Sequence, residues 1–275
     1  MRVHLEGGEF LAASQKLEIG LALTADIHEP DTEGVLQHSL GKVQTARGNI
    51  AAALTATTRA FELVTQIQNP NMALYCYNLV VLRSKIGDVL GARACTTHPA
   101  LKDNETADFL LALSWCDLNE QLAGQAISRL EQLQSELGAN FAEYQAKHAC
   151  TLARGYLMLG NRTRALEILE NLNLDIPPAL LASILSVKIE AEKPAKPHTL
   201  ENARTLLETK KLPPLETLEL RHALVTTARL KPKELQAQQK ELRRLTHLLA
   251  KTIPDELRLG FFEKWKIPDL IPSAK

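Results

Sequence analysis

A short motif recurs along the chain and constrains its fold more than any other feature. The motif is a Gly, in most copies followed by Asn or Asp, with an Ala five residues after the Gly. It is present at Gly48, Gly87 and Gly160, and Gly8 fits the same frame. The alanines in this position, two of them without the Gly, are Ala13, Ala53, Ala92, Ala126, Ala165 and Ala203. Successive alanines lie 34 to 40 residues apart, a length that suits two helices and two turns.

Each part of the motif has a physical role in a helix pair. Gly can adopt the left-handed backbone that ends a first helix, and Asn or Asp can cap the second. The small Ala lets the second helix approach its partner closely. Ala and Leu dominate the sequence and aromatic residues make up only 4%, which favours helix over strand. The sequence therefore predicts an all-α fold in which successive helix pairs cover each other's apolar faces.

The pattern resembles the tetratricopeptide repeat family. The residues that carry the resemblance are Leu40, Gly41, Gly48, Asn49, Ala53 and Ala60 in one unit, and Leu152, Tyr156, Gly160, Ala165 and Leu169 in another. It covers roughly residues 5 to 212, and it implies a right-handed, TPR-like solenoid that binds proteins or peptides. The family's aromatic residue near the start of the first helix is missing, and most steps are longer than usual, so other helix-pair solenoids remain open.

We expect two regions. Residues 1–230 form the repeat array of about six helix pairs, the first of them truncated. Too few residues precede Gly8 for a full first helix, so we expect a fragment of a longer protein; an atypical cap or a second chain is the alternative. Residues 231–275 form C-terminal helices. The amphipathic helix at 231–251 is either a dimerisation seam or a capping helix on the last repeat, and the terminal helix after Pro254 closes the end of the solenoid.

The terminal segment carries a second resemblance. Residues 253–265, IPDELRLGFFEKW, are similar to a tail that follows repeat domains in large bacterial signalling ATPases and transcriptional regulators. With the truncated start, this resemblance implies the sensor or docking domain of a multidomain bacterial regulator.

Charge is distributed unevenly along the chain although the formal net charge is zero. Residues 1–135 carry 15 acidic and 10 basic residues, whereas residues 196–251 carry 6 acidic and 12 basic ones. The asymmetry indicates an acidic partner or end-to-end association, or else an ordinary solvated surface. Direct contact with nucleic acid is not expected, because no aromatic residues are interleaved with the basic ones.

The sequence predicts a cytoplasmic protein. Neither a signal peptide nor an apolar run of membrane-spanning length is present. The four cysteines are scattered and contain no CxxC, which is typical of thiols in a reducing compartment: Cys76, Cys95, Cys116 and Cys150.

No catalytic motif is present, so we expect neither an enzyme nor a cofactor or metal. His148 and Cys150 lie two apart on a predicted helix and therefore point to opposite flanks, which favours structural roles. An enzyme on a helical-repeat scaffold is the less favoured alternative, and a self-association module is another.

The predicted site is a groove lined by the first helix of each pair. Counting back from each Gly gives His38, Lys42 and Thr45, then Tyr77, Val81 and Lys85, and then Lys147, Cys150, Arg154 and Leu157. The cations would form a mildly basic trough with Tyr77 as an apolar anchor. Such a trough could hold an acidic peptide or another domain of the parent chain. The alternative is a solvated surface without a ligand.

Overall fold

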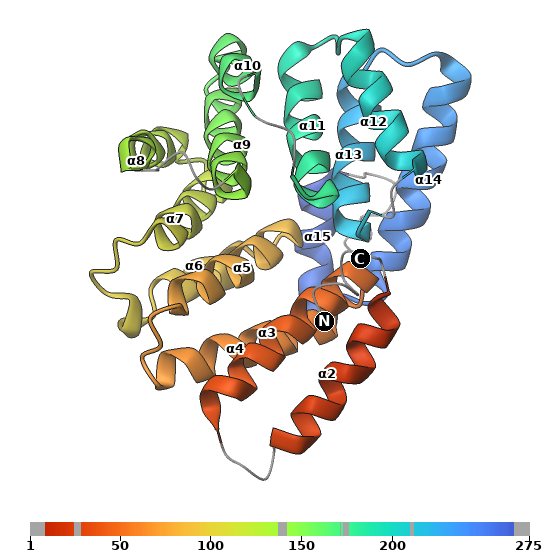
Figure 1. Cartoon of the computed structure of the whole chain (residues 1–275). Helices are drawn as coiled ribbons and strands as arrows, with labels where there is room; N and C mark the ends of the chain where they lie inside the picture. The colour runs from red at the N-terminus through yellow and green to blue at the C-terminus, as the bar shows by residue number, and fades with distance from the viewer. Residues whose placement is uncertain are drawn as a thin grey trace. The chain divides into compact units, whose positions relative to one another are not determined.

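A computed structural model describes residues 9–24, 29–136, 142–170, 172, 176–209 and 212–266. Over these ranges the regular structure is entirely helical, with fourteen α-helices, two short 3-10 helices and no strand (Figure 1). The all-α fold class is therefore confirmed. The right-handed solenoid stays a prediction.

The chain divides into two compact units. The terminal unit contains the described residues up to Ala112 together with those from Leu249 onward, and the central unit contains Leu113–Leu248. Helices of the terminal unit are α2 (Phe10–Thr24), α3 (Pro30–Arg47), α4 (Ile50–Gln66), α5 (Met72–Lys85), α6 (Val89–Thr96), η1 (Pro99–Leu101), η2 (Asp255–Leu257) and α15 (Arg258–Trp265). The boundary between the units falls within α7 (Ala107–Asn119).

The central unit continues as a series of helix pairs. Its helices after α7 are α8 (Ala123–Glu136), α9 (Ala142–Met158), α10 (Arg162–Glu170), α11 (Pro178–Glu192), α12 (Pro197–Thr209), α13 (Pro214–Thr227) and α14 (Pro232–Ala250). Helix α11 packs against both α9 and α13. The boundary expected at residue 230 falls in the turn between α13 and α14, and the repeat array before it stays a prediction.

The glycines of the motif end helices as expected. Gly48, Gly87 and Gly160 have φ angles of 78°, 80° and 77°, in the left-handed region. In each turn the Gly N–H donates to the carbonyl three residues earlier, and the next N–H donates to the carbonyl five residues earlier. This pair of bonds is the Schellman motif. Gln121 forms the same turn with φ 64°, five residues before Ala126, at a place where the sequence has no Gly.

The six alanines of the motif all lie in the interior. Each of them has an exposed fraction of 0%: Ala13, Ala53, Ala92, Ala126, Ala165 and Ala203. A buried side chain of this size allows helix axes to approach closely, so the role expected of the recurring Ala is supported at every position. The truncated first helix would fall on residues 1–8, outside the described part of the chain.

The expected helix caps form in two of three turns. Asp88 accepts a hydrogen bond from Gly91 N at 2.9 Å, and Asn161 accepts one from Arg164 N at 3.1 Å. The cap expected from Asn49 is wrong: its amide instead donates to Gln44 Oε1 at 2.9 Å. The reason is that Thr252 already accepts from the first N–H groups of α4, through its carbonyl at 2.7 Å from Ala51 N and its hydroxyl at 3.4 Å from Ile50 N.

The C-terminal segment belongs to the terminal unit. The amphipathic helix predicted at 231–251 is α14, which is confirmed, and the chain then returns to the terminal unit at Leu249. Trp265 Nε1 donates to Lys85 O at 3.1 Å, and Phe261 is fully buried. We expected this last helix at the end of the repeat array, but its contacts join it to the turn that follows α5.

The interior holds all four cysteine side chains, none of them joined in a disulfide. None of the helices in the described ranges combines the length and apolar character that a membrane crossing requires.

Candidate functional site

The first predicted site residues lie on α3. His38 is buried, and its ring meets that of Tyr75 from α5 with centroids 4.5 Å apart. Burial and the nearby charge of Lys42 lower the pKa of His38 to about 4, so the imidazole is neutral at pH 7. Thr45 donates its hydroxyl to Gly41 O at 2.9 Å, within its own helix. Of the three, only Lys42 is exposed.

The predicted residues on α5 are less accessible than expected. Tyr77 is 7% exposed, so it does not present an anchor at the surface. Val81 and Lys85 are partly exposed, and the backbone of Lys85 receives the indole N–H of Trp265. His38 and Tyr77 both lie ten residues before their turn glycines, and this position is buried in both helices.

The predicted residues on α9 are engaged within the central unit. Lys147 pairs with Glu143 at 2.8 Å, one turn away on the same helix. Cys150, ten residues before Gly160, is buried like His38 and Tyr77. His148 is also buried and contacts Leu130 O through Nε2 at 2.6 Å, which agrees with a structural role. Leu157 is partly exposed.

Arg154 forms the centre of a largely buried polar network, in which its own side chain stays partly exposed. Its guanidinium binds Glu219 of α13 and lies over the Trp115 ring of α7, 5.4 Å from the ring centroid. Ser183 of α11 donates to the other oxygen of Glu219 at 3.0 Å. Burial is the largest single influence on the pKa of Arg154 and lowers it, but the charge of Glu219, its hydrogen bond and the other acidic neighbours together outweigh burial, and the net shift is upward. Four helices of the central unit thus meet at one neutralised ion pair.

This network differs from the basic trough that we expected. The charge of Arg154 is compensated by Glu219, whose other carboxylate oxygen accepts a hydrogen bond from the Ser183 hydroxyl. Sequence reasoning missed Glu219 because it lies 65 residues from Arg154, and no local pattern links the two positions. Within the described ranges, no group of three His, Cys, Asp or Glu side chains is placed to hold a metal ion.

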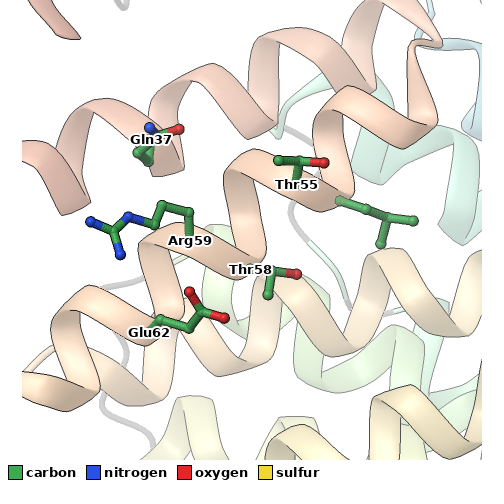
Figure 2. A pocket seen from close by; sticks show the side chains of 6 residues that line it. Gln37, Thr55, Thr58, Arg59 and Glu62 are labelled. Atoms are coloured by element: carbon green, nitrogen blue, oxygen red, sulfur yellow. The ribbon is translucent and has the colours of Figure 1, made fainter.

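A shallow depression lies between α3 and α4 in the terminal unit. Figure 2 shows Gln37 from α3 and four side chains from α4 around it. Its volume is about 490 Å³, and its lining is Gln37, Leu54, Thr55, Thr58, Arg59 and Glu62. Arg59 is paired with Glu33 at 2.9 Å. The depression therefore offers hydroxyl and amide groups together with the carboxylate of Glu62.

The outer face of α14 carries a row of basic side chains. Lys233, Lys240, Arg244 and His247 are all exposed, whereas Leu242 and Thr246 on the same helix are buried. The uneven charge of the sequence indicated this region but did not identify the residues. We call these four side chains the α14 basic face.

No family model matches the chain, and no curated protein matches it.

Proposed function

We propose that the chain is a non-catalytic helical-repeat module that binds a protein or peptide. The repeated turn carries the proposal: five turns between successive helices, at Gly48, Gln68, Gly87, Gln121 and Gly160, have the same pair of backbone bonds, and six alanines in one register are buried. Arrays of such pairs expose long helical surfaces to solvent, and this architecture serves chiefly for binding. The TPR resemblance and the right-handed solenoid form part of the proposal.

The surroundings of the charged groups also support binding over catalysis. Arg154 and Glu219 neutralise each other in the interior, and His38 is neutral and has no hydrogen-bond partner on either ring nitrogen among the described residues. The hydroxyl that donates to Glu219, that of Ser183, is buried together with the carboxylate, so this pair is not placed to reach a substrate as acid–base or covalent catalysis requires.

A bacterial regulatory protein is the proposed setting, with the chain as its sensor or docking part in the cytoplasm. The resemblance of residues 253–265 supports the setting, and the four buried thiols support the compartment. Because Phe261 and Trp265 of that segment are buried in the terminal unit, we assign them a structural role within the module.

The proposal is tested by capture followed by direct binding. The whole chain is immobilised, retained proteins are identified, and each is purified and titrated by calorimetry. We expect a partner with a Kd of about 10 µM or tighter. Lys42→Glu probes the predicted site on α3, with Lys102→Glu as a control of equal charge change on an exposed turn. Failure of every purified candidate to bind, or turnover of a small molecule by the chain, would overturn the proposed function.

A further inference from the structure

The α14 basic face forms a line along one side of a single helix. At 100° and 1.5 Å per residue, Lys233, Lys240, Arg244 and His247 lie within about 40° of one direction and span about 21 Å. The opposite side packs inward through Leu242, which is 5% exposed. The amphipathic pattern of α14 therefore fixes which side faces solvent, and that side is basic.

The positive charge of this face is largely uncompensated. Glu234 pairs with Arg204 at 2.8 Å, and Glu241 pairs with Arg244 at 2.9 Å. No ion pair of Lys233 or Lys240 lies within the described residues. An acidic group from another molecule could therefore bind these lysines without displacing an internal partner.

Arg221 of α13 adds to this excess of charge. Its guanidinium donates to the neutral Gln238 of α14 rather than to a carboxylate. The pKa of Arg221 is lowered, mainly by burial and further by the positive charge of Arg244, although Glu241 partly offsets the effect. Cations held this close together raise the local potential and attract anions.

We propose that the α14 basic face binds an acidic helical segment of a protein partner. The inference rests on the proposed function and names the chemistry of its ligand. A partner helix with carboxylates at intervals of 7, 4 and 3 residues matches the spacing of Lys233, Lys240, Arg244 and His247. Charge complementarity of this kind fixes register and accelerates association.

Two other classes of anion fit the face less well. Helix α14 contains no Phe, Tyr or Trp on which an unpaired base could stack. Its apolar side is turned inward at Leu242, and the single exposed leucine beside the face, Leu248, is a small apolar surface for insertion into a lipid membrane. An acidic protein segment needs neither feature.

The test uses the whole chain and a synthetic, labelled Ala-rich helical peptide with glutamates at the 7, 4 and 3 spacing. A second peptide has the same composition in scrambled order. Binding is followed by fluorescence anisotropy at about 50 and about 200 mM salt. The variant is Lys233→Glu with Lys240→Glu, and the control is Lys102→Glu with Lys193→Glu, two exposed lysines elsewhere. Circular dichroism verifies that both double variants keep their helix content.

We expect the wild-type chain to bind the spaced peptide more tightly than the scrambled one. The Kd of the spaced peptide should be at least about tenfold higher for the α14 variant and within about twofold of wild type for the control variant. Equal binding of both peptides, or equal losses in both variants, would overturn the proposal. So would tighter binding of single-stranded RNA or of phosphatidylserine vesicles with the same dependence on Lys233 and Lys240.

The outcome also separates this inference from the proposed function. A purified partner protein that binds the wild-type chain and the α14 variant equally would refute the basic face as its site while the binding function stands. Absence of any partner protein would refute the function itself.

Discussion

The terminal and central units use the same turn but surround it differently. A Cβ placed on Gly87 would lie 2.1 Å from Gly260 O, because the C-terminal segment packs against this turn. A Cβ on Gly160 would meet nothing within 4 Å. Both glycines have nearly equal φ angles, so the backbone requirement is shared while the steric one is not. The motif therefore encodes the turn, and a distant part of the chain decides what covers it.

The same contrast appears on the helices before the turns. Six residues before the Gly, Lys42 of the terminal unit is exposed, whereas Arg154 of the central unit is only partly exposed and is paired with the buried Glu219. Ten residues before it, His38 and Cys150 are both buried, but only His38 is a residue type whose ordinary pKa lies near neutral pH, and burial lowers that pKa to about 4. Equivalent positions thus contribute differently to stability, and each difference can be measured.

The largest expected effect comes from Arg154. Arg154→Met leaves Glu219 buried without its cation, and we expect a loss of about 3–5 kcal/mol in the free energy of unfolding. Lys42→Met at the equivalent, exposed position should change stability by no more than about 0.5 kcal/mol. Urea denaturation of both variants measures the difference.

A double variant isolates the cause. Arg154→Met combined with Glu219→Leu removes both charges, and it should recover most of the stability lost in the single variant. If the double variant is less stable than Arg154→Met alone, the ion pair is not the source of the loss.

The next largest difference in stability is expected between the turn at Gly87, which the C-terminal segment covers, and the open turn at Gly160. Gly87→Ala combines left-handed strain of about 1–2 kcal/mol with a backbone displacement near Gly260 of about 1–3 kcal/mol, so we expect a loss of about 3 kcal/mol. Gly160→Ala carries only the strain and should lose about 1–2 kcal/mol. Equal losses in thermal and urea denaturation would show that the C-terminal segment does not hold the Gly87 turn.

His38 should make stability depend on pH. Its pKa is about 4 in the folded chain and 6.5 for an unperturbed histidine, so between these values the unfolded chain binds more protons. Its contribution is complete above pH 6.5 and is lost as the pH falls toward 4, by roughly 1.4 kcal/mol per pH unit. Between pH 7 and pH 4.5 we therefore expect a loss of about 2–3 kcal/mol.

His38→Phe keeps a ring against Tyr75 and removes the titration. Urea denaturation at pH 7 and pH 4.5 should show a smaller loss at acid pH for the variant than for the wild-type chain. The other buried histidine, His148, is present in both chains and cancels in the comparison. An identical pH dependence in the two chains would rule out His38 as its source.

Local chemistry explains which parts of the structure could be predicted. Prolines start α3 and α11, and the turn glycines end α3, α5 and α9, because each acts on its own backbone. The left-handed Gln121 has no such signal. The pairing of Arg154 with Glu219 could not be predicted either, because it depends on packing between residues far apart in sequence.

The smallest expected effect is a difference in stability between two helix caps: Asn161 forms its cap, whereas Thr252 takes the place of Asn49 as the cap of α4. Asn161 accepts from Arg164 N in the central unit, so Asn161→Ala should cost about 1 kcal/mol. Asn49 is the same residue type at the same position of the motif, but Thr252 satisfies the N–H groups at the start of α4. Asn49→Ala should therefore lose only its bond to Gln44, about 0.5 kcal/mol.

Replacing Thr252 with Val removes the hydroxyl that contacts Ile50 N and Gly48 O. The Thr252 carbonyl still accepts from Ala51 N in this variant, so only the N–H of Ile50 is released. If the Asn49 side chain then replaces the lost hydroxyl, Asn49→Ala should cost more in the Thr252→Val background than in the wild-type chain. Equal costs in the two backgrounds, measured by urea denaturation, would mean that the Thr252 hydroxyl does not substitute for the local cap.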